Sequence, residues 1–140
     1  MLRSRFDDYI ARFNAQDATA FDDFLHPDVM VINGNMEIPG VEAMKAHYVD
    51  HIWPHFIEKL TPQLFVSDEQ ALAVQMWTNF RALHTAETLF GPVVKGDQFD
   101  YRGVIMYAIR GGRFEQIIVS YNSFSKTAAD GTVTQLGIVH

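Results

Sequence analysis

The sequence predicts an α+β domain in which three N-terminal helices pack on one antiparallel sheet. Apolar residues recur at helical spacing up to about residue 54, and from about residue 60 they alternate with polar residues at the period of a β-strand. Helices that are apolar on one side must bury that side, and the sheet is the partner that this chain offers. The length of 140 residues fits one ordinary domain, which we expect to span residues 1–140.

The helices are delimited by residues that start or stop helical structure. The first ends near residues 14–16, after an apolar stripe along one side. The second begins after Asp17, which is suited to cap a helix N-terminus, and stops at the His-Pro-Asp sequence of residues 26–28. A short strand over residues 29–32 follows, and Met, Tyr and Ile at helical spacing predict the third helix over residues 41–54.

Long runs of alternating residues, separated by turn clusters, predict the sheet. The expected strands cover residues 62–67, 70–85, 98–110 and 113–125. The last two are apolar on both faces, which is more apolar surface than three helices can cover. We therefore expect one face to line a core or pocket beneath the helices, and the other to meet a second copy of the chain across a two-fold axis.

Composition excludes several classes of function. Seventeen acidic and eleven basic side chains give a net charge of -6, which opposes binding to nucleic acid or anionic membranes. Without cysteine there is no disulfide, thiolate nucleophile or thiolate metal site. Acidic residues near the start and the lack of a long apolar run favour a cytoplasmic protein. Phosphate-binding loops and serine nucleophile elbows are missing from the sequence, so no cofactor is expected.

Three histidines four residues apart, His47, His51 and His55, lie along one side of the third predicted helix. His51 is the best-placed general base, because it lies one turn beyond Tyr48 and histidine titrates in the range that proton transfer needs. The alternative is a set of half-exposed or core histidines with satisfied nitrogens. No metal site is expected, because Pro54 should break the helix before His55 and no acidic partner lies at ligand spacing.

Two neutral polar residues interrupt an apolar face on the last long strand. Ser120 and Asn122 share the parity of Ile118 and Phe124. A buried amide or hydroxyl needs a hydrogen-bond partner, and a ligand oxygen is one. Tyr101, on the neighbouring strand, is expected to point into the same cavity. These residues are therefore candidates for binding a small hydrophobic ligand.

The order of helices and strands resembles the NTF2-like superfamily, which includes ketosteroid isomerase and the SnoaL-like polyketide cyclases. Local motifs support the resemblance along nearly the whole chain. They lie at residues 26–28 (His-Pro-Asp), 40–44 (Gly-Val-Glu-Ala-Met), 82–86 (Ala-Leu-His-Thr-Ala), 112–114 (Gly-Arg-Phe) and 134–137 (Thr-Gln-Leu-Gly). The resemblance implies a single SnoaL-like domain with a cone-shaped fold: three helices on a curved sheet around a deep pocket.

The resemblance also implies roles for individual positions. Tyr9 matches the isomerase tyrosine that donates a hydrogen bond to the substrate carbonyl, and Tyr48 falls where a second tyrosine supports it. Asn33 falls where the isomerase keeps its proton-shuttling aspartate. Ile105 replaces a protonated aspartate or a histidine, and Asn122 replaces the aspartate of the cyclases. The hydrogen-bond donors are therefore retained, whereas the familiar bases are not.

Three hypotheses follow. In the first, the chain is a cofactor-independent isomerase, cyclase or dehydratase of a small apolar carbonyl compound, in which Tyr9 polarises the carbonyl and His51 moves the proton. Asn33, Ser120 and Asn122 then fix the orientation of the substrate. In the second, the chain binds such a ligand without transforming it, because amides have replaced carboxylates. The third and weakest is a purely structural dimer whose cavity is filled by its own side chains.

Overall fold

The structure is a computed structural model and describes residues 1–137. Its helical elements lie near the N-terminus and are α1 (Arg3–Asn14), α2 (Thr19–Phe24), α3 (Val41–Ala46) and the wider π-helical turn η1 (His47–Ile52). The strands are β1 (Leu25–Asn33), β2 (Met36–Pro39), β3 (Phe56–Ser67), β4 (Ala71–Ala82), β5 (Ala86–Thr88), β6 (Gly91–Val93), β7 (Gln98–Arg110), β8 (Arg113–Thr127) and β9 (Val133–Gln135).

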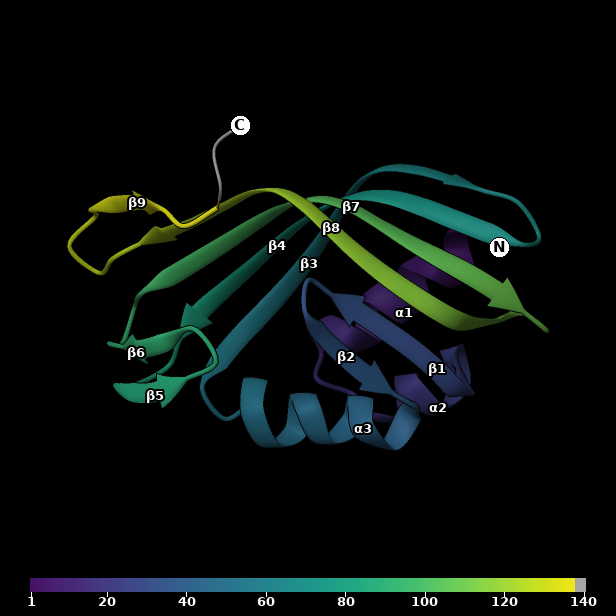
Figure 1. Cartoon of the computed structure of the whole chain (residues 1–140), viewed down its shortest axis with the longest axis horizontal. Coiled ribbons are helices and arrows are strands. Elements are labelled where there is room, and N and C mark those ends of the chain that lie inside the picture. Colours follow the sequence, from purple (N-terminus) through teal and green to yellow (C-terminus); the bar gives the residue numbers. More distant parts are fainter. Residues whose placement is uncertain (138–140) are drawn as a thin grey trace.

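The main sheet has the order β2-β1-β8-β7-β4-β3, with β9 paired to β8, and β5 and β6 form a separate hairpin. Its long strands curve over the helices, which all lie on the concave side (Figure 1). The predicted fold class is confirmed. The sheet is mixed rather than wholly antiparallel, because β1 runs parallel to β8. Among residues 1–137, no helix combines the length and apolar character needed to cross a membrane.

The helices are held on the sheet by an aromatic core. The predicted stripe of α1 is buried, and its Phe6 and Tyr9 rings both pack against Phe114 of β8. Asp17 accepts the backbone N–H of Thr19 at 3.0 Å, which satisfies one of the free donors at the start of α2. This packing fixes α1 beneath the sheet and directs Tyr9 toward the interior.

The third helix differs from its prediction in length and in geometry. It ends at Ile52, two residues before Pro54, and its last turn is π-helical, since the Trp53 N–H donates to the Tyr48 carbonyl at 2.8 Å, five residues back. The chain then enters β3 at Phe56, earlier than the predicted start at residue 62.

A β-bulge interrupts the pairing of β7 with β8. Arg102 lies opposite Ser123 and Gly103 lies opposite Tyr121, so Asn122 is an extra residue on β8. The strands approach so closely here that a Cβ on Gly103 would clash with the Ser120 carbonyl oxygen. The bulge changes which side chains of β8 face the helices.

Candidate functional site

A cavity of about 610 Å³ lies between the helices and the concave face of the sheet. Most of its wall is aliphatic and aromatic. The polar groups on it come from Asn33, His47, Glu58, Thr78 and the hydroxyls of Tyr9, Tyr48, Tyr101 and Tyr107. Within residues 1–137 no lysine or arginine lines this cavity. Its size and lining are those of a site for a small, uncharged, largely apolar molecule.

Glu58 is the most unusual group on this wall. Phe56, Glu58 and Leu60 alternate along β3 with their side chains turned inward, and the Glu58 side chain is 5% exposed. Its Oε2 atom has no hydrogen-bond partner among the described residues. Burial raises the pKa of Glu58 to about 8, because the ionised carboxylate would lose its hydration. At neutral pH, Glu58 is therefore mainly a neutral carboxylic acid that can donate a proton.

Tyrosine hydroxyls line the same cavity as this acid. Burial raises the pKa of Tyr9 and of Tyr48, and the Glu58 charge raises both further. The pKa of Tyr101 is raised to about 12 by burial, with smaller contributions from Tyr121 and Glu58. All four side chains, Glu58, Tyr9, Tyr48 and Tyr101, line the same cavity. Their phenols stay protonated and can donate hydrogen bonds to a ligand oxygen.

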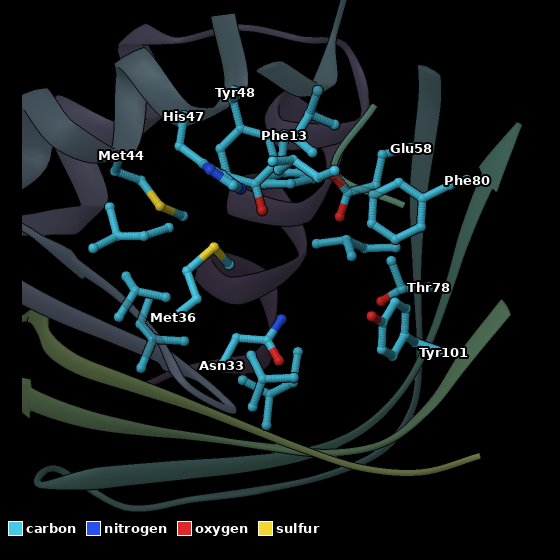
Figure 2. A pocket seen from close by; sticks show the side chains of 18 of the residues that line it. Phe13, Asn33, Met36, Met44, His47, Tyr48, Glu58, Thr78, Phe80 and Tyr101 are labelled. Atoms are coloured by element: carbon cyan, nitrogen blue, oxygen red, sulfur yellow. The ribbon is translucent and has the colours of Figure 1, made fainter. Parts of the chain in front are cut away.

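His47 is a second titratable group on the cavity wall. It begins η1, is half-buried, and packs its ring edge-on against Tyr48 with 5.1 Å between the ring centroids. Burial lowers the pKa of His47, and the neighbouring His51 lowers it further. Figure 2 shows His47, Tyr48 and Glu58 entering the pocket from one side, while Asn33 enters from the opposite side.

Five of the eight residues predicted for the site lie on the cavity wall. They are Tyr9, Asn33, Tyr48, Tyr101 and Ile105. They come from α1, β1, η1 and β7, so residues far apart in the sequence converge on one space. Their expected roles in catalysis and binding stay predictions.

The other three predicted residues lie outside this cavity. His51 is exposed on the solvent side of η1, so the expectation that it reaches the substrate is wrong. Ser120 and Asn122 are also exposed, because the bulge reverses the side-chain parity of β8: Val119 and Phe124 line the cavity instead. His55 lies beyond the end of η1, and its Nδ1 lies 3.0 Å from Nε2 of His84.

Glu58 was not among the predicted site residues, and no carboxylate was expected in the pocket. The signal was present as a carboxylate between two apolar residues of the same parity, in the pattern Phe56-x-Glu58-x-Leu60. It was overlooked because the strand was predicted to begin at residue 62.

The side chains of residues 1–137 form no group of three or more histidines and carboxylates suited to hold a metal ion.

Comparison with known proteins gives a family and a fold. The family model described as "SnoaL-like domain" matches residues 6–117. None of the curated proteins matches this sequence. Several solved structures are similar to this chain at low identity.

Ketosteroid isomerase from a Mycobacterium species is 15% identical, with a TM-score of 0.65 over 94% of this chain and 96% of its own. A proposed polyketide cyclase from Pseudomonas putida is 22% identical, with a TM-score of 0.69 over 84% of this chain and 88% of its own. A computationally designed 17-OHP binder is 16% identical, with a TM-score of 0.65 over 91% of this chain and 92% of its own. At these identities the similarity establishes the fold.

Proposed function

This chain belongs to the SnoaL-like domain family, and on that premise we propose that it enolises a small, uncharged carbonyl compound inside its cavity. An enol-like intermediate leads to isomerisation, cyclisation or loss of water without a cofactor. The observation that carries the proposal is Glu58, a buried carboxyl group with one unpartnered oxygen in an otherwise largely apolar space. Buried groups with strongly shifted pKa values concentrate at functional sites.

The first requirement of enolisation is a set of donors for the oxygen that gains charge. Tyr48 and Tyr9 present phenols that stay protonated, and Glu58 adds an acidic O–H beside them. In a dry cavity such donors stabilise a developing oxyanion much more strongly than water does. This carboxylic acid comes from β3. The position on β7 where ketosteroid isomerase has its protonated aspartate is occupied here by Ile105. Asn33, across the cavity, orients the substrate in this proposal.

The second requirement is a substrate that relieves the cost of burying Glu58. A buried polar atom without a partner destabilises a fold by roughly 1–3 kcal/mol. A carbonyl oxygen accepts the Glu58 proton in a hydrogen bond, while a carboxylate ligand would place a second acid beside it in a cavity that no described lysine or arginine lines. The largely apolar lining and the neutral acid both favour an uncharged carbonyl compound.

A suitable probe is 2-tetralone, an uncharged bicyclic ketone with acidic protons beside its carbonyl. In heavy water, the wild-type chain should replace these protons with deuterium faster than buffer does, as followed by proton NMR. Glu58→Gln keeps the shape and loses the transferable proton, so the rate should fall by about a hundredfold. Glu69→Gln, on the exposed turn between β3 and β4, is the matched control and should keep the wild-type rate. Equal rates for wild type and Glu58→Gln would remove Glu58 from the reaction.

The second candidate function is binding without chemistry. It is favoured by Asn33, an amide on the cavity wall that cannot accept a proton from carbon. The designed 17-OHP binder shows that a similar fold can serve binding alone. A wild-type chain that binds 2-tetralone tightly and exchanges none of its protons would support this reading. A purely structural role is less compatible with a cavity of about 610 Å³.

We also propose that the chain forms a homodimer through the outer face of the sheet. Val104 and Met106 are 42% and 45% exposed there. Large apolar side chains grouped on one face are typical of a protein interface. Light scattering should give the mass of two chains for wild type and of one chain for Met106→Lys. A monomeric wild type would contradict the proposal.

A further inference from the structure

The proposed function leaves one step without a residue. Something must remove the proton from the carbon beside the carbonyl, and Glu58 does not accept it while it is itself protonated. Among the described residues, His47 and Glu58 are the only histidine and carboxylate side chains that line the cavity. We propose that His47 is the general base that takes this proton while Glu58 acts as the acid, an inference that rests on the proposed enolisation.

The backbone of η1 turns His47 toward the cavity. In a π-helical turn the hydrogen bonds join residues five apart, and the bond from the Trp53 N–H to the Tyr48 carbonyl is of this kind. His47 and Ile52 are five residues apart, and both line the cavity. His51, which an α-helix would align with His47, faces solvent instead. Irregular turns of this type occur frequently at functional sites.

Tyr48 connects the proposed base with the proposed acid. The His47 and Tyr48 rings meet edge-on at an interplanar angle of 89°. Glu58 lines the same cavity, and its charge adds to the effect of burial in raising the pKa of Tyr48. Figure 2 shows His47 and Glu58 on either side of Tyr48. A carbonyl oxygen held near the Tyr48 hydroxyl would therefore lie between a base and an acid.

The local environment gives each group the protonation state that its role needs. Burial and the charge of His51 lower the pKa of His47, so its imidazole is neutral at neutral pH and can accept a proton. Burial of Glu58 raises its pKa to about 8, so it can give one. Two titratable groups whose pKa values are shifted in opposite directions are typical of an acid–base pair. The other titratable groups of the described residues on the cavity wall are Tyr9, Tyr48, Tyr101 and Tyr107, and the His51 ring centroid lies 6.5 Å from that of His47.

The proton transfers balance without a co-reactant. A ring nitrogen of His47 takes the proton from carbon, the electron pair of the C–H bond forms the C=C bond of the enol, and the carbonyl oxygen takes the proton of the Glu58 O–H. This leaves an imidazolium and a carboxylate. In the return step, the imidazolium protonates carbon while the carboxylate takes back the enol proton. Both residues are restored, and delivery to a different carbon of an unsaturated ketone completes an isomerisation.

The test compares His47 with its exposed neighbour. His47→Gln should slow deuterium exchange into 2-tetralone by about a hundredfold, while His51→Gln should stay within about twofold of wild type. His47→Ala opens space on the wall, and added imidazole should restore at least part of its rate. The wild-type rate should fall on the acidic side of its pH profile as His47 becomes protonated, and this fall should be missing in His47→Ala. Binding of 2-tetralone, followed by NMR line broadening, checks that the variant site stays intact.

The outcomes separate this inference from the proposed function. A large loss in Glu58→Gln with a normal rate in His47→Gln would keep the enolisation and overturn the role of His47. Normal rates in both variants would overturn both proposals. A loss in His47→Ala without rescue by imidazole and with the acidic limb intact would also overturn the inference, because His47 would then only support the structure.

Discussion

The two walls of the cavity differ in chemistry and in backbone regularity. Where η1 meets β3, the wall carries His47, Tyr48 and Glu58, and the backbone widens into a π-turn. The opposite wall, formed by the regular part of β7 and β8, presents Ile105 and Val119 from paired positions. The first wall can exchange protons with a ligand, whereas Ile105 and Val119 can only shape the space around it.

This contrast shows where the fold can support reactive groups. A residue at the centre of a sheet has neighbours on both sides, and an ionisable group there would be buried among apolar side chains. Glu58 is on β3, at the edge of the sheet, on the strand that follows η1 directly. It nonetheless remains buried and shifted in pKa. We therefore expect the wall with Glu58 to lower the free energy of unfolding and the apolar wall to raise it.

The largest expected effect is on the pH dependence of stability. Glu58 has a pKa of about 8 in the folded chain and an ordinary value of 4.5. Between these values the unfolded chain has released this proton and the folded chain still holds it, so the free energy of unfolding falls as pH rises through this window. At about 1.4 kcal/mol per pH unit, the contribution of Glu58 falls by on the order of 5 kcal/mol and levels off above pH 8.

Urea unfolding of wild type and Glu58→Gln from pH 5 to 8.5 measures this effect. The difference between the two curves isolates Glu58, because His47, whose lowered pKa makes stability rise with pH below about 6.5, is present in both. Asp97, whose pKa is lowered by its hydrogen bonds and by Lys126, contributes only at lower pH. Parallel curves for the two proteins would show that Glu58 has an ordinary pKa in the folded chain.

The second effect compares one residue from each wall during catalysis. Tyr48→Phe removes a donor from the reactive wall and should lower the rate of exchange into 2-tetralone by about a hundredfold. Ile105→Val removes one methylene from the apolar wall and should change the rate by less than about fivefold, with its main effect on binding. Rates at saturating 2-tetralone separate the two effects. Equal losses in the two variants would mean that the wall with Tyr48 has no special role.

The third effect is the loss of rate in alkaline solution. As pH rises through about 8, Glu58 loses the proton that it donates, and its charge then repels a developing oxyanion. The exchange rate should fall about tenfold for each further pH unit, and the fall should be absent in Glu58→Gln. A wild-type rate that stays level up to pH 9.5 would contradict the assignment of Glu58 as the acid.

The sequence was sufficient to predict the fold, because the change from helical to alternating periodicity survives in the structure. The family resemblance read from the sequence also predicted Tyr9, Tyr48 and Asn33 as site residues, and all three line the cavity. Local backbone irregularities account for the main errors. Helical spacing assumes a uniform turn, whereas the last turn of this helix is π-helical. As a result, His47 lines the cavity in place of the predicted His51. Glu58 was not predicted because β3 begins at Phe56, before the predicted start at residue 62.

The bulge in β8 accounts for the remaining error and for the smallest predicted effect. Alternation assigns faces correctly only in an unbroken strand, and the extra residue at Asn122 reverses the faces. Because Ser120 and Asn122 are exposed, Ser120→Ala and Asn122→Ala should leave the exchange rate and the affinity for 2-tetralone within about twofold of wild type. A tenfold loss of rate in either variant, with an unchanged oligomeric state, would mean that these side chains reach the substrate after all. If the variant lost both the dimer and the rate, the loss of rate would instead mean that contacts on the outer face of the sheet affect the cavity through the bulge.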